Sequence, residues 1–133
     1  MSLSSIATPG ACPCGTGRAF ASCCAPYVVD GLAPPTAEAT MRSRYAAYAL
    51  GVPDHLFRTW HPQTRPAEVS VPDETRWTGL DVLAVVGGGA DDATGVVEFA
   101  AHWRSGDQQG VLRERSTFAR RGGRWVYVDG VTS

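Results

Sequence analysis

The sequence of 133 residues contains no lysine and no asparagine, and every basic side chain other than histidine is an arginine. The formal net charge is −1, so the chain lacks the positive field that holds nucleic acid or an anionic membrane surface. No apolar run approaches the length that spans a membrane. We therefore expect neither direct nucleic-acid binding nor a membrane function.

The N-terminal segment, Met1 to Ala11, lacks the basic n-region and the apolar h-region of a signal peptide. This absence favours a cytoplasmic protein, in a compartment where thiols stay reduced. The length fits one domain with a small appendage.

Cysteine is missing from most of the chain and is confined to one stretch of thirteen residues, at Cys12, Cys14, Cys23 and Cys24. In a reducing compartment such a cluster is more often a metal site than a disulfide framework. Two closely spaced pairs of thiolates supply the four soft ligands that tetrahedral Zn²⁺ requires. Gly15 and Gly17 allow the sharp turn between them, and Arg18 can offset part of the thiolate charge. The sequence therefore predicts a zinc site.

Since the protein fills all four positions, we expect a structural rather than a catalytic site. Two alternatives stay open at this point. The same thiols can be free or paired in disulfides, or they can act as a redox switch.

Helical patterns follow the cysteines. Thr36 is a suitable N-cap, and Gly51 can end the helix, whose apolar face carries Ala37, Met41, Tyr45 and Tyr48. A second helix is predicted from Asp54 to Trp60, because Pro53 suits a first turn and Pro62 disfavours helical geometry in the residue before it.

After Pro66 the pattern changes to strands, which we expect over residues 80–86, 96–104, 111–119 and 124–128. Turns rich in Gly and Asp separate these runs, as in an antiparallel meander. If Gly122 and Gly123 form a two-residue turn, Phe118 lies opposite Tyr127, and Arg120 lies opposite Trp125. Two helices followed by a meander predict an α+β fold with a concave, ligand-accepting side.

Alternation along the third strand places Glu114 and Ser116 on the inner face, because the opposite choice would bury Arg113 and Arg115. A carboxylate among aromatic residues needs hydrogen-bond donors. Glu114 is therefore either a pocket acid, base or ligand anchor, or an internal fastener bonded to an arginine, a tyrosine hydroxyl or His61. The candidate pocket residues are Glu114, Ser116, His61, Arg42, Tyr45 and Trp60.

Two of these candidates have a second interpretation. His61 can instead cap the last carbonyls of the helix before it. Of Arg42 and Arg44, which lie on adjacent helix faces, we expect one to pair with a carboxylate and the other to be solvated. No residue is assigned a catalytic role.

The cysteine stretch, with its Cys-Pro-Cys-Gly opening, resembles the SEC-C motif, a zinc module named from the C-terminus of the SecA translocase. The segments "PPTAEATMRSRYAAYALG", "TWHPQTRP", "WTGLDVL" and "GRWVYVDG" resemble the bacterial YchJ-like family, so that the likeness runs from Ala11 to Gly130. Many SEC-C motifs end on a histidine ligand where this chain has Cys24, which binds zinc equally well.

The resemblance implies a fold in two parts. A SEC-C zinc knuckle with a flexible N-terminus would span residues 1–31, and a cone-shaped domain similar to nuclear transport factor 2 would span residues 32–133. In the cone, helices pack on a curved antiparallel sheet. Cone domains often pair through the open sheet face, so a homodimer is a further expectation by analogy.

The resemblance also bears on function, although it implies no defined activity. In SecA the SEC-C module contacts a protein chaperone and the ribosome, which favours a zinc-containing adaptor whose knuckle docks a protein partner. The alternative is a small-molecule binder or enzyme that takes a small apolar ligand in the pocket around Glu114.

Overall fold

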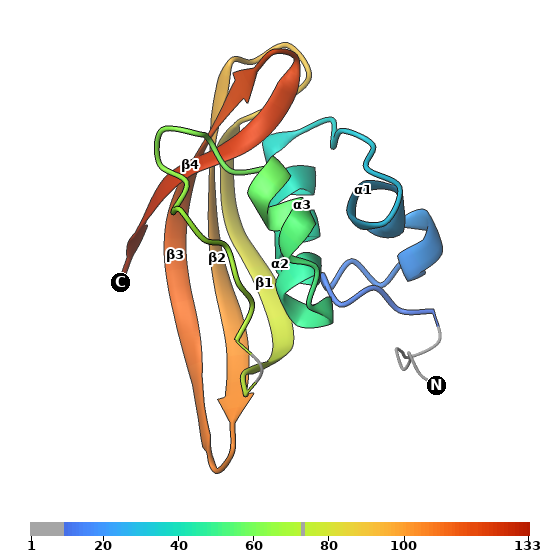
Figure 1. Ribbon diagram of the computed structural model, residues 1–133, viewed down its shortest axis with the longest axis vertical. Coiled ribbons are helices and arrows are strands. Elements are labelled where there is room, and N and C mark those ends of the chain that lie inside the picture. The colour runs from blue at the N-terminus through green and yellow to red at the C-terminus, as the bar shows by residue number, and fades with distance from the viewer. Residues whose placement is uncertain (1–9, 73) are drawn as a thin grey trace.

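The computed structural model describes residues 10–72 and 74–133 and has the expected α+β architecture (Figure 1). The expected flexible N-terminus concerns residues 1–9, which lie outside the described part. The helical elements are η1 (Phe20–Ser22), α1 (Ala25–Val28), α2 (Ala37–Leu50) and α3 (Pro53–Arg58). The strands are β1 (Arg76–Gly87), β2 (Thr94–Ser105), β3 (Gln108–Arg121) and β4 (Arg124–Thr132).

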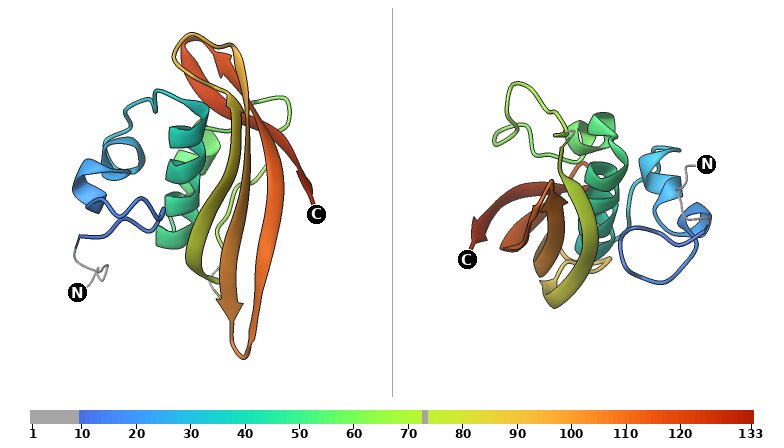
Figure 2. Two further views of the ribbon diagram at one scale, coloured as in Figure 1. Left: turned by 180° about the vertical axis from the view of Figure 1, so that it is seen from behind. Right: turned by 90° about the horizontal axis from the view of Figure 1, so that it is seen from below.

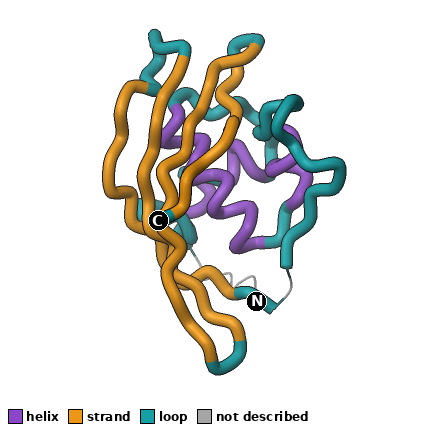
Figure 3. The backbone as a smooth tube through the Cα atoms, turned by 90° about the vertical axis from the view of Figure 1, so that its left-hand side faces the viewer, coloured by secondary structure: helices purple, strands orange, loops and turns teal. Residues whose placement is uncertain are grey.

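The molecule is layered. The four strands form one antiparallel sheet in the order β1-β2-β3-β4, and α2 lies between this sheet and the cysteine-containing segment (Figure 2). The strands curve along their length (Figure 3), and register shifts at three places accompany the bending, two between β1 and β2 and one between β3 and β4. The predicted register of the last hairpin is confirmed, since Phe118 pairs with Tyr127 and Arg120 with Trp125.

Local signals set the ends of α2. The Thr36 side chain accepts a hydrogen bond from the Ala39 N–H at 3.0 Å, and Gly51 ends the helix with a φ of 74°. The end of α3 differs from the prediction, because the helix stops at Arg58 rather than continuing to Trp60. The backbone after it pairs with β4 instead: Tyr127 N–H donates to Thr59 O at 2.7 Å.

The core lies between α2 and the inner face of the sheet. Met41 and Tyr45 of α2 pack against Phe99 of β2 and Phe118 of β3. The four cysteines belong to the same buried cluster, so the N-terminal segment shares its core with the cone domain. No helix in the described residues is long and apolar enough to cross a membrane.

Candidate functional site

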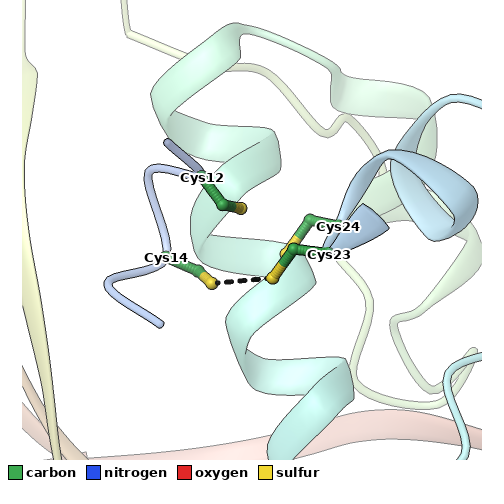
Figure 4. A group of neighbouring side chains, drawn as sticks. All are labelled: Cys12, Cys14, Cys23 and Cys24. Carbon is green, nitrogen blue, oxygen red and sulfur yellow. Dashed lines mark hydrogen bonds between the residues drawn. The ribbon is translucent and has the colours of Figure 1, made fainter. Parts of the chain in front are cut away.

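The four cysteines come together as the sequence predicts (Figure 4). Their Sγ atoms all lie within 4.8 Å of one another, and each cysteine is at most 5% exposed. None of them forms a disulfide. Tetrahedral zinc with four sulfur ligands separates the sulfurs by about 3.8 Å. This value lies between the 3.5 Å from Cys14 Sγ to Cys23 Sγ and the 4.8 Å limit of the cluster, so small shifts would complete such a site. The residues therefore fit a metal ion held by four thiolates.

A tight loop positions the first pair. Cys12 N–H donates to Arg18 O at 2.8 Å, closing the loop, and Gly15 and Gly17 turn it with φ values of 85° and 83°. Gly15 also lies against the sheet: a Cβ atom there would sit 2.9 Å from the Leu80 carbonyl oxygen. Only glycine satisfies both conditions at this position.

Short helical turns return the second pair to the first. Cys23 follows η1, and Cys24 is the residue before α1, where its carbonyl accepts the Val28 N–H at 2.8 Å. Pro26 within the first turn of α1 suits this start, since its missing N–H costs no helical hydrogen bond there.

Neighbouring donors surround the sulfurs. Thr16 Oγ1 lies 3.2 Å from Cys23 Sγ, and the exposed Arg18 guanidinium donates to the same sulfur at 3.8 Å, which raises the pKa of Arg18. Hydrogen bonds with the Cys12 and Cys24 thiols lower the pKa of Cys14, whereas hydrogen bonds with the Cys12 and Cys14 thiols, together with burial, raise the pKa of Cys24.

Arg42 belongs to this centre and not to the pocket in which the sequence placed it. Its Nη1 donates to Cys14 O at 2.7 Å, and its Nε donates to Glu38 Oε2 at 3.0 Å. The carboxylate pairing that we expected for one of the two helix arginines is thus found. It lies on the side of α2 that faces the cysteine loop.

A cavity of about 270 Å³ lies on the other side of α2, against the inner face of the sheet. Its lining includes four of the predicted pocket residues, Glu114, Ser116, Tyr45 and Trp60. The remaining lining residues are mainly aromatic and aliphatic: Met41, Arg44, Tyr48, Trp77, Phe99, Ala101, Leu112, Phe118 and Tyr127.

Among the described residues, His61 is not part of the cavity lining, and the C-cap of α3 is Thr59 and not His61. Its ring Nδ1 accepts the Gln63 N–H at 3.1 Å. Its backbone N–H donates to Tyr127 O at 2.8 Å, which directs the side chain into the following loop. The pairing with β4 therefore decides the position of His61, and helix spacing could not reveal it.

Arg44 is the arginine of the cavity, and the expectation that one of the two helix arginines is solvated is wrong. Arg44 is 6% exposed; its Nη1 donates to Leu56 O at 3.0 Å and to Thr59 Oγ1 at 2.8 Å. The guanidinium lies 4.8 Å from the ring centre of Trp60 and 4.7 Å from that of Tyr127. Burial lowers its pKa to about 10, so it stays charged at neutral pH.

A sequence signal for Arg44 existed. It lies three residues after Met41 and four before Tyr48, so it shares their helix face. This spacing alone indicates that Arg44 can be buried together with Met41 and Tyr48.

Glu114 is fastened by a tyrosine hydroxyl, one of the partners considered for it. Tyr127 Oη donates to Glu114 Oε2 at 3.0 Å, and burial, together with this carboxylate, raises the pKa of Tyr127. The carboxylate lies over Gly130, where a methyl group would overlap it. Position 130 therefore requires glycine as long as Glu114 keeps this place.

Family models match both parts of the chain. The SEC-C motif matches residues 11–26, and the YchJ middle NTF2-like domain matches residues 36–130. A UPF0225 protein of Streptomyces coelicolor is 47% identical over 119 residues, which cover 90% of this chain and 93% of that protein.

Two solved structures are similar over most of the chain. A SEC-C motif containing protein from Rhodopseudomonas palustris has a TM-score of 0.79 and 33% identity, covering 92% of this chain and 98% of that one. A second SEC-C motif containing protein, from Psychrobacter arcticus, has a TM-score of 0.74 and 28% identity, covering 98% of this chain and 85% of that one. The chain therefore belongs to the YchJ-like UPF0225 family, with a SEC-C motif ahead of its NTF2-like domain.

Proposed function

We propose that this protein is a zinc-bearing adaptor, in which Cys12, Cys14, Cys23 and Cys24 hold Zn²⁺ and the knuckle docks a protein partner. The gathering of four buried sulfurs within 4.8 Å of one another carries the proposal. A four-thiolate set favours zinc and leaves no open position for a substrate. The ion would be a structural staple for a segment too short to hold its own core.

The surface beside the knuckle supports the docking role. Val29 and Leu32, which follow α1, are 68% and 59% exposed. Large apolar side chains placed next to a rigid metal loop are suited to contact another protein. The SEC-C resemblance favours the same role, since in SecA the module contacts proteins.

The test combines metal analysis with affinity capture from the native cell. Protein purified without chelators is expected to contain one zinc per chain. A Cys23→Ser variant is expected to lose most of the zinc and to capture no partner. Glu114→Gln, which leaves the knuckle intact, should capture the partner as the parent does. Absence of stoichiometric zinc, or undiminished capture by Cys23→Ser, would overturn the proposal.

A second candidate function rests on the cavity. A small-molecule site around Glu114 is favoured by one observation: buried polar atoms of Trp60 and Ser116, both of which line the cavity, have no hydrogen-bond partner among the described residues. Native interiors rarely leave such groups unpaired.

A further inference from the structure

We infer that the cavity beneath α2 accepts a small aromatic carboxylate, whose carboxylate group lies at Arg44 and whose ring lies among the aromatic side chains. This inference rests on the second candidate function and names its ligand class. The cavity of about 270 Å³ is near the lower limit of small-molecule sites, so the ligand is a compact one.

The walls select for an aromatic body. Trp77 stands edge-on to Tyr45 with 6.1 Å between ring centres, and Phe118 meets Tyr127 at 5.8 Å. Trp60 also meets Tyr127, at 5.4 Å. All five side chains line the cavity. Such edge-to-face frames leave ring faces and edges for another aromatic group to pack against.

The polar groups of the cavity select for hydrogen-bond acceptors. Trp60 Nε1 is a donor and has no acceptor among residues 10–72 and 74–133. Ser116 Oγ, on a residue 1% exposed, also has no partner in that part of the chain. Each of these two atoms exposes less than 1 Å², so a ligand that carries oxygen acceptors satisfies both groups once the two side chains turn toward it, whereas an amine would satisfy only the serine.

The charge of the cavity selects for an anion. Arg44 is a buried cation, and within the described part of the chain neither of its hydrogen bonds goes to a carboxylate. Its position between two aromatic rings offsets only part of the desolvation cost of a guanidinium. Glu114 attracts the guanidinium only from a distance, so a ligand carboxylate supplies the directly hydrogen-bonded counter-charge through the remaining guanidinium donors.

The charge of Glu114 distinguishes an anionic ligand from the alternative, a cationic ligand. Its carboxylate is already bonded to Tyr127 and lines the same cavity, so it repels a bound anion. Were the ligand a cation paired with Glu114, the same carboxylate would attract it. Removing the charge of Glu114 therefore strengthens the binding of an anion and weakens that of a cation.

The experiment titrates the metal-loaded protein with benzoate and 2-naphthoate, and with their neutral amides, while following tryptophan fluorescence and amide NMR shifts. At least one acid is expected to bind saturably and at least tenfold more tightly than its amide. Glu114→Gln is expected to tighten acid binding several-fold, because glutamine can still accept from Tyr127. Glu98→Gln, on the outer sheet face beside Arg113, is the matched control and should change nothing.

Three outcomes would overturn the inference. Equal binding of acid and amide would contradict an anionic ligand while leaving a ligand site. Weaker binding of the acid to Glu114→Gln would contradict the placement of the ligand carboxylate near Glu114. No saturable binding of any probe would remove both the ligand class and the second candidate function. Arg44→Gln should abolish the preference for acid over amide; should it fail to fold, the comparison of acid and amide in the parent still decides.

Discussion

Gly15 meets two demands at once, a left-handed backbone and close approach to the Leu80 carbonyl oxygen. Gly17 has nearly the same φ, but a Cβ atom there would meet nothing within 4 Å. The two glycines therefore separate backbone strain from steric contact at the junction between the cysteine loop and β1.

We expect Gly15→Ala to lower the free energy of unfolding by about 2–3 kcal/mol, since strain of about 1–2 kcal/mol adds to the contact with Leu80. Gly17→Ala should lower the free energy of unfolding only by the cost of the backbone strain. Urea denaturation at fixed metal loading measures both variants. Equal losses would contradict the role given to the Leu80 contact.

At the residue scale, the sequence predicted the groups whose chemistry is local and missed those whose position depends on packing. The spacing of the four cysteines predicted that they form one cluster. The alternation of residues along the third strand predicted that Glu114 and Ser116 lie on the inner face. Arg44 was expected to be either paired or solvated, because no local rule shows that Leu56 O and Thr59 would satisfy it.

The ends of α2 show how far local chemistry determines an element. Thr36 accepts the Ala39 N–H, and Gly51 takes the left-handed conformation that ends the helix. Both were predicted, since capping depends on residues within one turn. The end of α3 was not predicted, because the pairing of Thr59 with Tyr127 spans most of the cone domain.

Thr36→Ala should destabilise the protein by about 1 kcal/mol, because the N–H of Ala39 then loses its acceptor. Thr36→Ser keeps the hydroxyl and should recover most of that loss. Thermal unfolding of the three proteins at one metal loading provides the comparison. If serine were no better than alanine, the cap would not be the source of the effect.

The strand ends were also underestimated. The sequence indicated strands over 96–104 and 111–119. In the structure β2 extends to Ser105, and β3 already begins at Gln108. Exposed polar residues such as Gln108 and Gln109 carry no alternating pattern, so their pairing with β2 leaves no trace in periodicity.

On the scale of the whole molecule, His55 connects helices that the sequence treated separately. Its Nε2 lies 2.8 Å from Ser43 Oγ of α2, and the residue is 2% exposed in α3. Burial, with smaller contributions from Arg58 and Arg44, lowers its pKa from 6.5 to about 4. The folded protein thus holds His55 uncharged at neutral pH.

Stability should consequently depend on pH in a defined window. His55 binds a proton more readily in the unfolded state than in the folded state. Lowering the pH from about 6.5 to about 4 therefore stabilises the unfolded state relative to the folded state. Full stability is present above that window, and about 3 kcal/mol is lost across it. Denaturant midpoints measured from pH 7.5 to 4 provide the test.

His55→Gln is expected to flatten that dependence relative to the parent, and any metal-linked contribution cancels in the difference. A parent whose stability is constant over the window would contradict a buried neutral His55.

The two arginines of α2 are two residues apart, yet Arg42 reaches the carbonyl of Cys14 and Arg44 borders the cavity. Helix α2 therefore separates the thiol cluster from the cavity and contacts both. If the cysteines hold a metal ion as proposed, ligand binding to the cavity should be measured on metal-loaded protein, because loss of the ion would remove a support on the opposite side of α2.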